Sequence, residues 1–169
     1  MDASEMKALQ APLKARYLEE PGAALVRLRA EGGLAPDRLA CKVETGKALV
    51  EAGLHPKTGG DGSAACSGDM LLEALAACAG VTMSAVAKAI GVEIRTGRVR
   101  AEADFDARGT LGVDREAQVG LTNVTLDFSL DTDADDEKLA TLLKLTERYC
   151  VILQTLRQGQ AVLATLARG

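Results

Sequence analysis

The stretch that decides the fold is Gly68-Asp-Met-Leu-Leu-Glu-Ala-Leu-Ala-Ala-Cys-Ala-Gly-Val-Thr-Met-Ser-Ala-Val-Ala-Lys-Ala-Ile90. Apolar residues cover most of the circumference of a helix built from it, and only a narrow stripe is mixed. A helix that is apolar nearly all round must be buried on several sides. We therefore predict a central helix over residues 68–90, with Ser67 as its N-cap, Asp69 in its first turn and Gly91 closing it.

Segments that alternate apolar and polar residues flank the central helix and predict antiparallel strands. Glu31-Gly-Gly is the expected turn of a first hairpin. The step from Leu121 to Val124 breaks strict alternation and predicts a bulge. The predicted strands are residues 24–30, 38–45, 48–52, 92–108, 118–130 and 161–167, with residues 109–115 joining the two longest.

Three more helices are predicted, the first of them from apolar residues at three- and four-residue steps. They cover residues 3–19, residues 135–149 and a short piece ending near Leu156. In the second of them, Leu139, Leu142, Leu143 and Thr146 are expected to face inward. The element order predicts an α+β fold with antiparallel pairs rather than a doubly wound sheet.

Composition excludes several classes of function. The chain has 169 residues, which suits one domain, and its 20 basic against 24 acidic residues leave no electrostatic footprint for nucleic acid. Two Phe, two Tyr and no Trp cannot build a platform for stacking bases. The N-terminus has no apolar signal segment and no run of about 18 apolar residues spans a membrane, so a cytoplasmic protein is expected.

The cysteines are the residues with chemistry to offer. Four cysteines and one histidine make a zinc site or a histidine-based triad hard to assemble, so we expect no metal and no cofactor. His55, in a Gly/Pro loop, is expected to be solvated. Cys78 and Cys150 are either small core residues or a pair that meets only in the fold. Such a pair permits one thiolate to reduce a peroxide and the other to resolve the sulfenic acid as a disulfide.

Two motifs carry a resemblance to a known family. The stretch from Ser67 to Met83 resembles the central helix of the OsmC/Ohr family of thiol peroxidases, in which an acidic residue opens a Leu/Ala-rich helix and a cysteine follows about nine residues on. The stretch Leu145-Thr-Glu-Arg-Tyr-Cys-Val-Ile-Leu-Gln-Thr-Leu156 is similar to the second cysteine motif of that family. Element order and length agree over roughly residues 22–167.

The resemblance implies an architecture. It predicts an OsmC-like α+β fold in which antiparallel sheets surround two central helices of an intertwined homodimer, with active sites at the subunit interface. Residues 22–169 would form the OsmC-like domain and residues 1–21 an N-terminal helical extension.

The resemblance also implies roles for individual residues. Cys78 would be the peroxidatic cysteine and Cys150 the resolving one. An arginine from an early hairpin, Arg38 or else Arg29, would pair with the acidic residue Asp69 to position the thiolate and lower its pKa. Nine residues turn a helix by about half a circle, so a contact between Asp69 and Cys78 needs a bend or the other subunit.

The chain departs from the family pattern in two respects. The second motif usually has Pro directly after the cysteine, where it helps to restart a helix, and this chain has Val151. The peroxide pocket usually carries aromatic residues, and Tyr149 is the one ring expected nearby. Cys66, at the mouth of the central helix, has no family counterpart and is an alternative resolving thiol or an inert one.

The predicted function is therefore reduction of organic hydroperoxides in oxidative-stress defence, with a lipoyl or thioredoxin-like dithiol as reductant. A non-catalytic redox sensor or small-molecule binder on the same fold is one alternative. The other is a hot-dog thioesterase, which also wraps strands around a long apolar helix and would use a carboxylate such as Glu73 or Asp69.

Overall fold

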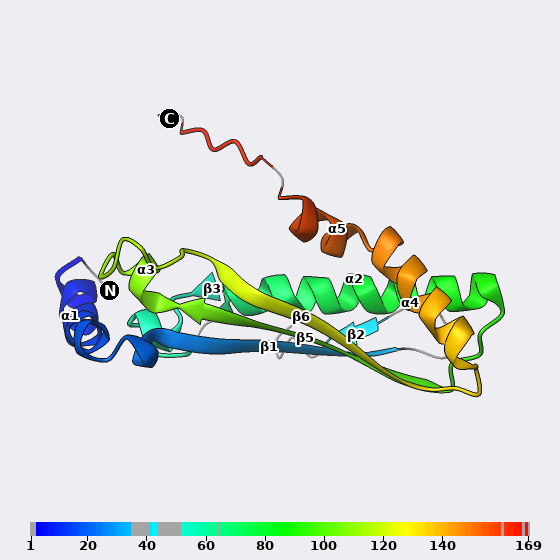
Figure 1. Ribbon diagram of the computed structural model, residues 1–169. Coiled ribbons are helices and arrows are strands. Elements are labelled where there is room, and N and C mark those ends of the chain that lie inside the picture. Colours follow the sequence, from blue (N-terminus) through cyan, green and yellow to red (C-terminus); the bar gives the residue numbers. More distant parts are fainter. Residues whose placement is uncertain are drawn as a thin grey trace.

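One long helix lying along one face of an antiparallel sheet forms the centre of the molecule (Figure 1). The computed structural model describes residues 3–34, 41–43, 52–63, 65–159, 161–166 and 168. The helix is α2 (Ser67–Ile90), and the four-stranded sheet has the order β2-β1-β5-β6. Its strands are β1 (Leu25–Leu34), β2 (Cys41–Val43), β5 (Thr96–Asp106) and β6 (Leu121–Asp131). The mixture of helix and antiparallel sheet confirms the predicted α+β class.

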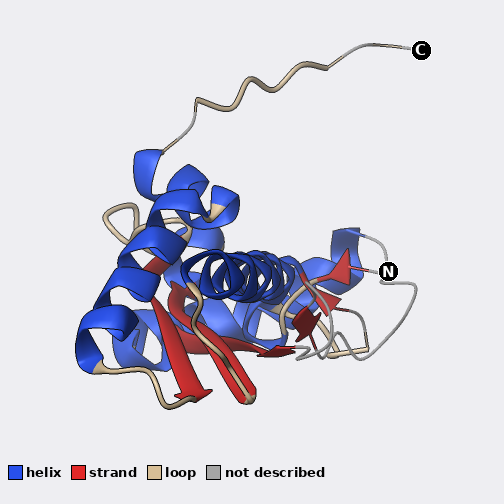
Figure 2. Cartoon of the chain, turned by 90° about the vertical axis from the view of Figure 1, so that its right-hand side faces the viewer, coloured by secondary structure: helices blue, strands red, loops and turns tan. Residues whose placement is uncertain are grey.

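The remaining elements surround this centre. The sheet covers one side of α2, and α4 and α5 lie on another side (Figure 2). The helices are α1 (Ala3–Glu19), α3 (Ala107–Thr110), α4 (Asp136–Tyr149) and α5 (Val151–Gln158), with 3-10 turns η1 (Pro21–Ala24) and η2 (Pro56–Thr58). Two short parallel strands, β3 (Ala52–Gly53) and β4 (Ala65–Cys66), lead into α2.

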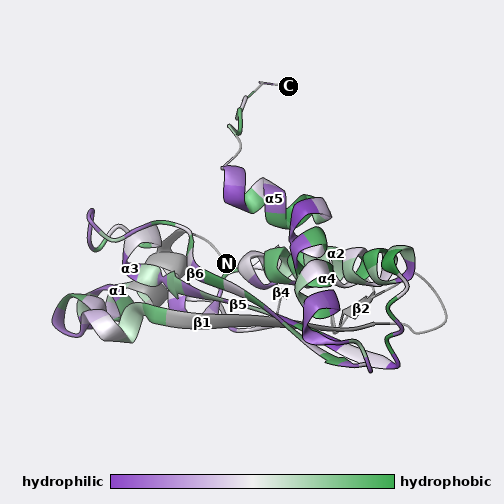
Figure 3. Cartoon of the chain, turned by 45° about the vertical axis from the view of Figure 1, so that its right-hand side comes forward, coloured by the Kyte–Doolittle hydropathy of each residue, from purple (hydrophilic) through white to green (hydrophobic). Residues whose placement is uncertain are grey.

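The core forms where α2 meets β5. Leucines and alanines of α2 are buried against Val99, Ala101 and Ala103, the alternate residues of β5 that face the helix. Because two of these three side chains are alanines, the helix approaches the strand closely. Figure 3 shows that α2 is mostly apolar along its length. Among the described residues, α2 alone has the length and composition of a membrane span, and half of that stretch is buried inside the protein, as in a core helix of a soluble protein.

The start of α2 differs from the prediction by one residue. The helix begins at Ser67 itself, and its N-cap is Cys66, whose side chain makes no capping hydrogen bond. Cys66 is still part of β4, where it pairs with Gly53, so the extended backbone ends directly before the helix. The predicted C-cap is confirmed, because Gly91 has a φ of 71° in the left-handed region.

The predicted turn at Glu31-Gly-Gly is wrong. β1 runs straight through these residues to Leu34 and pairs with β5 from Leu25, opposite Asp106, to Gly33, opposite Arg98. The long partner strand supplies hydrogen bonds that hold the glycines extended, which outweighs their preference for turns. The returning strand is confirmed at Cys41–Val43. The rest of predicted strands 38–45 and 48–52, except Ala52, lies outside the described residues.

The predicted bulge is confirmed in β6. Between the pairs that join Glu102 to Thr125 and Asp104 to Thr122, β6 contains one residue more than β5. Asn123 takes up the extra length with a φ of 50° and donates a side-chain hydrogen bond to the Asp104 carboxylate at 2.8 Å. Both long strands begin a few residues later than predicted, at Thr96 and Leu121.

α4 crosses α2 and buries one of its faces there. Leu142 and Thr146 are buried, Leu139 is half-buried, and Leu142 packs against Met83 in the core. Leu143 is 44% exposed, so the prediction that it faces inward is wrong. A step of 100° from Leu142 turns its side chain away from α2.

The predicted last strand is also wrong for this single chain. The described residues 161–166 form no strand and extend away from the body (Figure 1). Val162, Leu163 and Leu166 are between 87% and 98% exposed. Without a neighbouring strand an alternating segment has nothing to pair with, because strand formation depends on its partners.

α1 is found at the predicted residues and docks at the end of the sheet far from α4 (Figure 1). Tyr17 is fully buried there with Ala24, Ala107 and Leu111. Its hydroxyl donates a hydrogen bond to the Lys57 carbonyl at 2.6 Å, which joins α1 to η2. Burial raises the pKa of Tyr17, so the hydroxyl remains a donor.

We expect Tyr17→Phe to lower the free energy of unfolding by about 1 kcal/mol, because it removes this hydrogen bond and leaves the carbonyl without that donor. Tyr149→Phe is the matched control, since Tyr149 is the only other tyrosine and is 56% exposed. Urea unfolding of both variants measures the effect. Equal midpoints for Tyr17→Phe and the wild type would contradict the docking described here.

Candidate active site

Cys150 is the single residue between α4 and α5. Its φ of −72° and ψ of 108° are extended, so it ends one helix and caps the next. Its N–H donates to the Thr146 carbonyl at 2.9 Å, and its own carbonyl accepts from the Gln154 N–H at 2.9 Å. Val151 is the first residue of α5. The helix therefore restarts directly after Cys150 although no proline is present.

The fold brings Cys78 and Cys150 together. Cys78 is half-buried in the middle of α2, where it packs against the core cluster that contains Leu75, Cys150 and Leu153. Cys150 is fully buried, and its thiol lies close enough to Cys78 for the two side chains to affect each other's ionisation. Two cysteines 72 positions apart in the sequence therefore become direct neighbours.

The surroundings of Cys150 favour its neutral thiol. Burial, together with the neighbouring thiol of Cys78, raises the pKa of Cys150 to about 11. Backbone N–H groups of Leu153 and Ile152 at the start of α5 oppose the shift without cancelling it. The expected helix start is thus present at Cys150, but it does not make this residue a stabilised thiolate, because desolvation outweighs the helix terminus.

Asp69 is placed away from Cys78 within one chain. Nine residues of helix separate the two by about 13.5 Å along the axis. The charged neighbours of Asp69 are His55, which lowers its pKa, and Glu73, whose own pKa is raised by burial and by Asp69. Burial is the larger effect on Asp69 and leaves its pKa raised.

His55 differs from its predicted state. It is half-buried rather than solvated, and its Nδ1 accepts a hydrogen bond from the Lys57 N–H at 3.0 Å. Its ring lies edge-on to Phe105, with 6.1 Å between the ring centroids. His55 therefore belongs to the packing at the start of α2.

Of the two candidate arginines, the structure describes only the position of Arg29. Arg38 lies outside the described residues. Arg29 lies on β1 at the register position opposite Glu102 of β5.

Cys66 cannot resolve Cys78 of its own chain. Twelve residues of α2 separate them by about 18 Å, whereas a disulfide needs Cα atoms about 4.4–6.8 Å apart. Of Cys66 and Cys150, only Cys150 can therefore pair with Cys78 within one chain.

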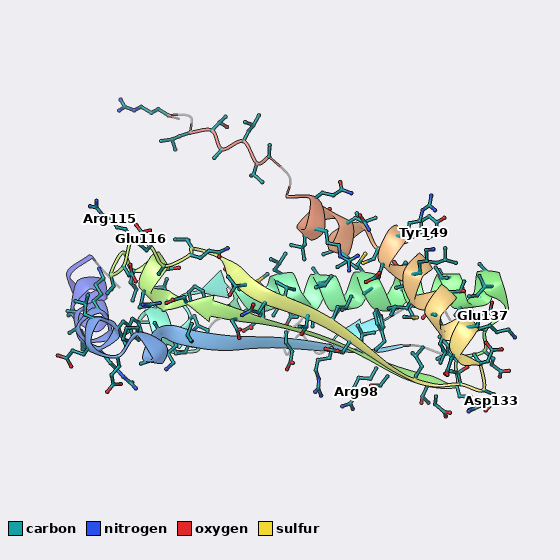
Figure 4. The ribbon with its side chains drawn as sticks, viewed as in Figure 1. Arg98, Arg115, Glu116, Asp133, Glu137 and Tyr149 are labelled. Carbon is teal, nitrogen blue, oxygen red and sulfur yellow. The ribbon has the colours of Figure 1, made fainter. Side chains whose placement is uncertain are left out.

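An apolar groove of about 250 Å³ lies beside the thiol pair. Leu75 and Leu153 line it and also belong to the cluster that holds Cys78 and Cys150. Arg157 and Glu147, paired at 2.6 Å, line it as well. The other lining residues are Val124, Thr125, Leu126, Phe128, Leu143 and Leu156. Phe128 is thus the ring of this groove, whereas Tyr149, the ring expected from the sequence, points to solvent (Figure 4).

A larger depression of about 760 Å³ lies over β5 and β6 on charged side chains. Arg98, Arg100, Asp127 and Asp131 are among its lining residues. Figure 4 shows Arg98 pointing away from α2, so this depression has no connection with the two thiols.

Comparisons with known proteins agree with this fold. The family described as OsmC-like protein matches residues 60–164, more than half of the chain. An OsmC-like hydroperoxide resistance protein from Jannaschia sp. CCS1 has a similar structure, with a TM-score of 0.62 and 19% sequence identity. The similarity covers 86% of this chain and 95% of that protein. A search among curated proteins finds no match.

The raised pKa of Cys150 has a consequence for stability. A neutral thiol in the folded state stabilises the protein fully below the pKa of an unfolded thiol, about 8.5, and this contribution is lost as the pH rises towards 11. We therefore expect the difference in free energy of unfolding between wild type and Cys150→Ala, both reduced, to shrink between pH 8 and pH 11. Leu153→Ala, which removes a buried neighbour without a titrating group, should keep a constant difference from wild type. A constant difference for Cys150→Ala would contradict the raised pKa.

Proposed function

Because the chain belongs to the OsmC-like protein family, we propose that it is a cysteine-based thiol peroxidase that reduces organic hydroperoxides in defence against oxidative stress. The observation that carries the proposal is the contact between Cys78 and Cys150 at the junction of α4 and α5. The apolar groove beside the pair suits the organic part of such a peroxide. The structural neighbour from Jannaschia sp. CCS1 bears a name that refers to hydroperoxide resistance.

The chemistry takes two steps on the protein. The Cys78 thiol releases its proton, the thiolate attacks the outer peroxide oxygen, the O–O bond breaks, and Cys78 becomes a sulfenic acid while the leaving alkoxide takes up a proton from solvent in place of the one released. The Cys150 thiol then attacks the Cys78 sulfur, water leaves, and a disulfide joins α2 to the α4–α5 junction. A dithiol reductant, lipoyl or thioredoxin-like, takes up the two oxidising equivalents and restores both thiols.

The different surroundings of the two thiols suit these roles. Cys78 is the more accessible of the two, as the residue that meets the peroxide must be. Cys150 is fully buried and neutral, so it is protected from direct oxidation, which requires thiolate character and exposure.

A second subunit would complete the site. We assign Asp69 and Arg38, or else Arg29, to positioning the Cys78 thiolate of the partner subunit in an intertwined homodimer. The length of α2 between Asp69 and Cys78 supports this assignment, because it excludes a direct contact within one chain. β6 is the last strand of the sheet order, and the apolar residues of the segment 161–166 are exposed, so surfaces for a partner exist.

The proposed organisation keeps residues 22–169 as the OsmC-like domain and residues 1–21 as an N-terminal extension. The family match falls within the first of these ranges. A location in the cytoplasm, where thiols are kept reduced, agrees with the proposed dithiol reductant. The hot-dog thioesterase is not retained, because that alternative depended on a different fold.

Counting free thiols after addition of cumene hydroperoxide tests the peroxidase. We expect the wild type to lose two free thiols. In Cys78→Ser, the remaining Cys150 thiol should stay free. In Cys150→Ser, the reaction should stop at a sulfenic acid on Cys78 that dimedone traps. Cys66→Ser is the matched control and should behave as wild type. No loss of thiols in the wild type, or a loss that depends on Cys66, would overturn the proposal.

The same assay separates a peroxidase from a redox sensor. With a dithiol such as dihydrolipoamide in excess, a peroxidase consumes many equivalents of peroxide per protein. A disulfide that forms once and is not turned over identifies the sensor instead.

Sedimentation equilibrium tests the homodimer. We expect a mass of twice 17.6 kDa. A mass of 17.6 kDa at all concentrations, with peroxidase activity intact, would show that one chain completes the site alone.

A further inference from the structure

We propose that Thr146 is a positioning residue for the thiol pair: its hydroxyl, bonded to the sulfur of Met83, holds α4 in the register on α2 that places Cys150 against Cys78. The inference rests on the proposed function for its role in catalysis. The contacts of Thr146 with Met83 and Cys150 bear only on the proximity of the two thiols.

The contact lies in the dry interface between α2 and α4. Thr146 is fully buried and Met83 is 1% exposed. The Thr146 hydroxyl donates to the Met83 sulfur, with 3.6 Å between oxygen and sulfur. A buried hydroxyl requires a hydrogen-bond partner, and thioether sulfur is a weak acceptor that can serve as one.

Thr146 also touches the reactive junction through its backbone. Its carbonyl accepts the N–H of Cys150 at 2.9 Å. One residue therefore binds α2 with its side chain and Cys150 with its main chain. Movement of Thr146 relative to α2 would carry Cys150 with it.

The Thr146–Met83 contact lies at a similar distance from the thiol pair along each of the two helices. Met83 follows Cys78 by five residues, about 7.5 Å along α2, and Thr146 precedes Cys150 by four residues, about 6 Å along α4. Leu142 packs in the same interface but makes apolar contacts, which have no preferred direction. A slip of one helical turn, about 5.4 Å, would move Cys150 out of disulfide range, so a directional contact next to it matters.

Thr146→Val tests the role, because it keeps the shape of the side chain and removes the hydroxyl. We expect sulfenic acid to form on Cys78 at the wild-type rate, and the disulfide to close about two- to threefold more slowly, the factor that a hydrogen bond at the weak end of the net range supplies. The equilibrium of the Cys78–Cys150 disulfide with dithiothreitol should shift towards the reduced protein by a similar factor.

Three further variants separate positioning from general stability. Thr146→Ser keeps the hydroxyl and should restore both measurements. Met83→Leu removes the acceptor and should reproduce Thr146→Val, while the double variant should be no worse than either single one. Thr141→Val, on the exposed side of α4, is the matched control and should change neither measurement.

The outcomes distinguish this inference from the proposed function. If wild type does not react with peroxide, the proposed function fails, but the dithiothreitol equilibrium still reports the proximity of the thiols. If Thr146→Val shows the wild-type closing rate and equilibrium, or if Thr146→Ser restores neither, Thr146 has no positioning role. The same holds if every variant shifts the equilibrium only in proportion to its loss of stability in urea.

Discussion

The structure depends on the packing of α2 against β5. Ala101 and Ala103 leave room for the helix, and its leucines and alanines fill that room. Burial of this apolar surface is the largest favourable contribution to folding, and it requires the rest of the chain to enclose α2. The sheet closes one side, and α4 with α5 closes another (Figure 2). Cys78 lies on this enclosed helix, so the same packing that stabilises the fold sets how much of its thiol remains accessible.

The junction of α4 and α5 places a second thiol, that of Cys150, next to Cys78 in this packed core. Cys150 alone separates the two helices, and its backbone makes a hydrogen bond with a residue of each. Its side chain is buried in the core. Burial makes it a neutral thiol and the contact with Cys78 gives it a partner. The two cysteines thus differ in exposure, which suits the peroxidatic and resolving roles proposed for them.

Much of the fold around the site could be predicted from the sequence because its motifs are local. The central helix, the bulge near Asn123 and the helix restart at Cys150 all depend on residues a few positions apart. Thr146 and Arg157 could not be found in this way. Thr146 was recognisable as an inward-facing residue of a helix, but its partner Met83 lies 63 positions away. The turn predicted wrongly at Gly32 and Gly33 has a related cause, since a long-range partner strand overrode a local preference.

The amino-acid sequence by itself determined the class of fold, the buried central helix and the identity of the cysteines worth testing, because apolar periodicity and short motifs act within a few residues. Only the tertiary structure decided that Cys150 reaches Cys78 and Cys66 does not, that Asp69 lies by His55, and that Cys150 is a neutral thiol. These outcomes depend on which distant segments exclude water from one another. Burial and proximity are properties of the packed chain, and no short stretch of residues carries them.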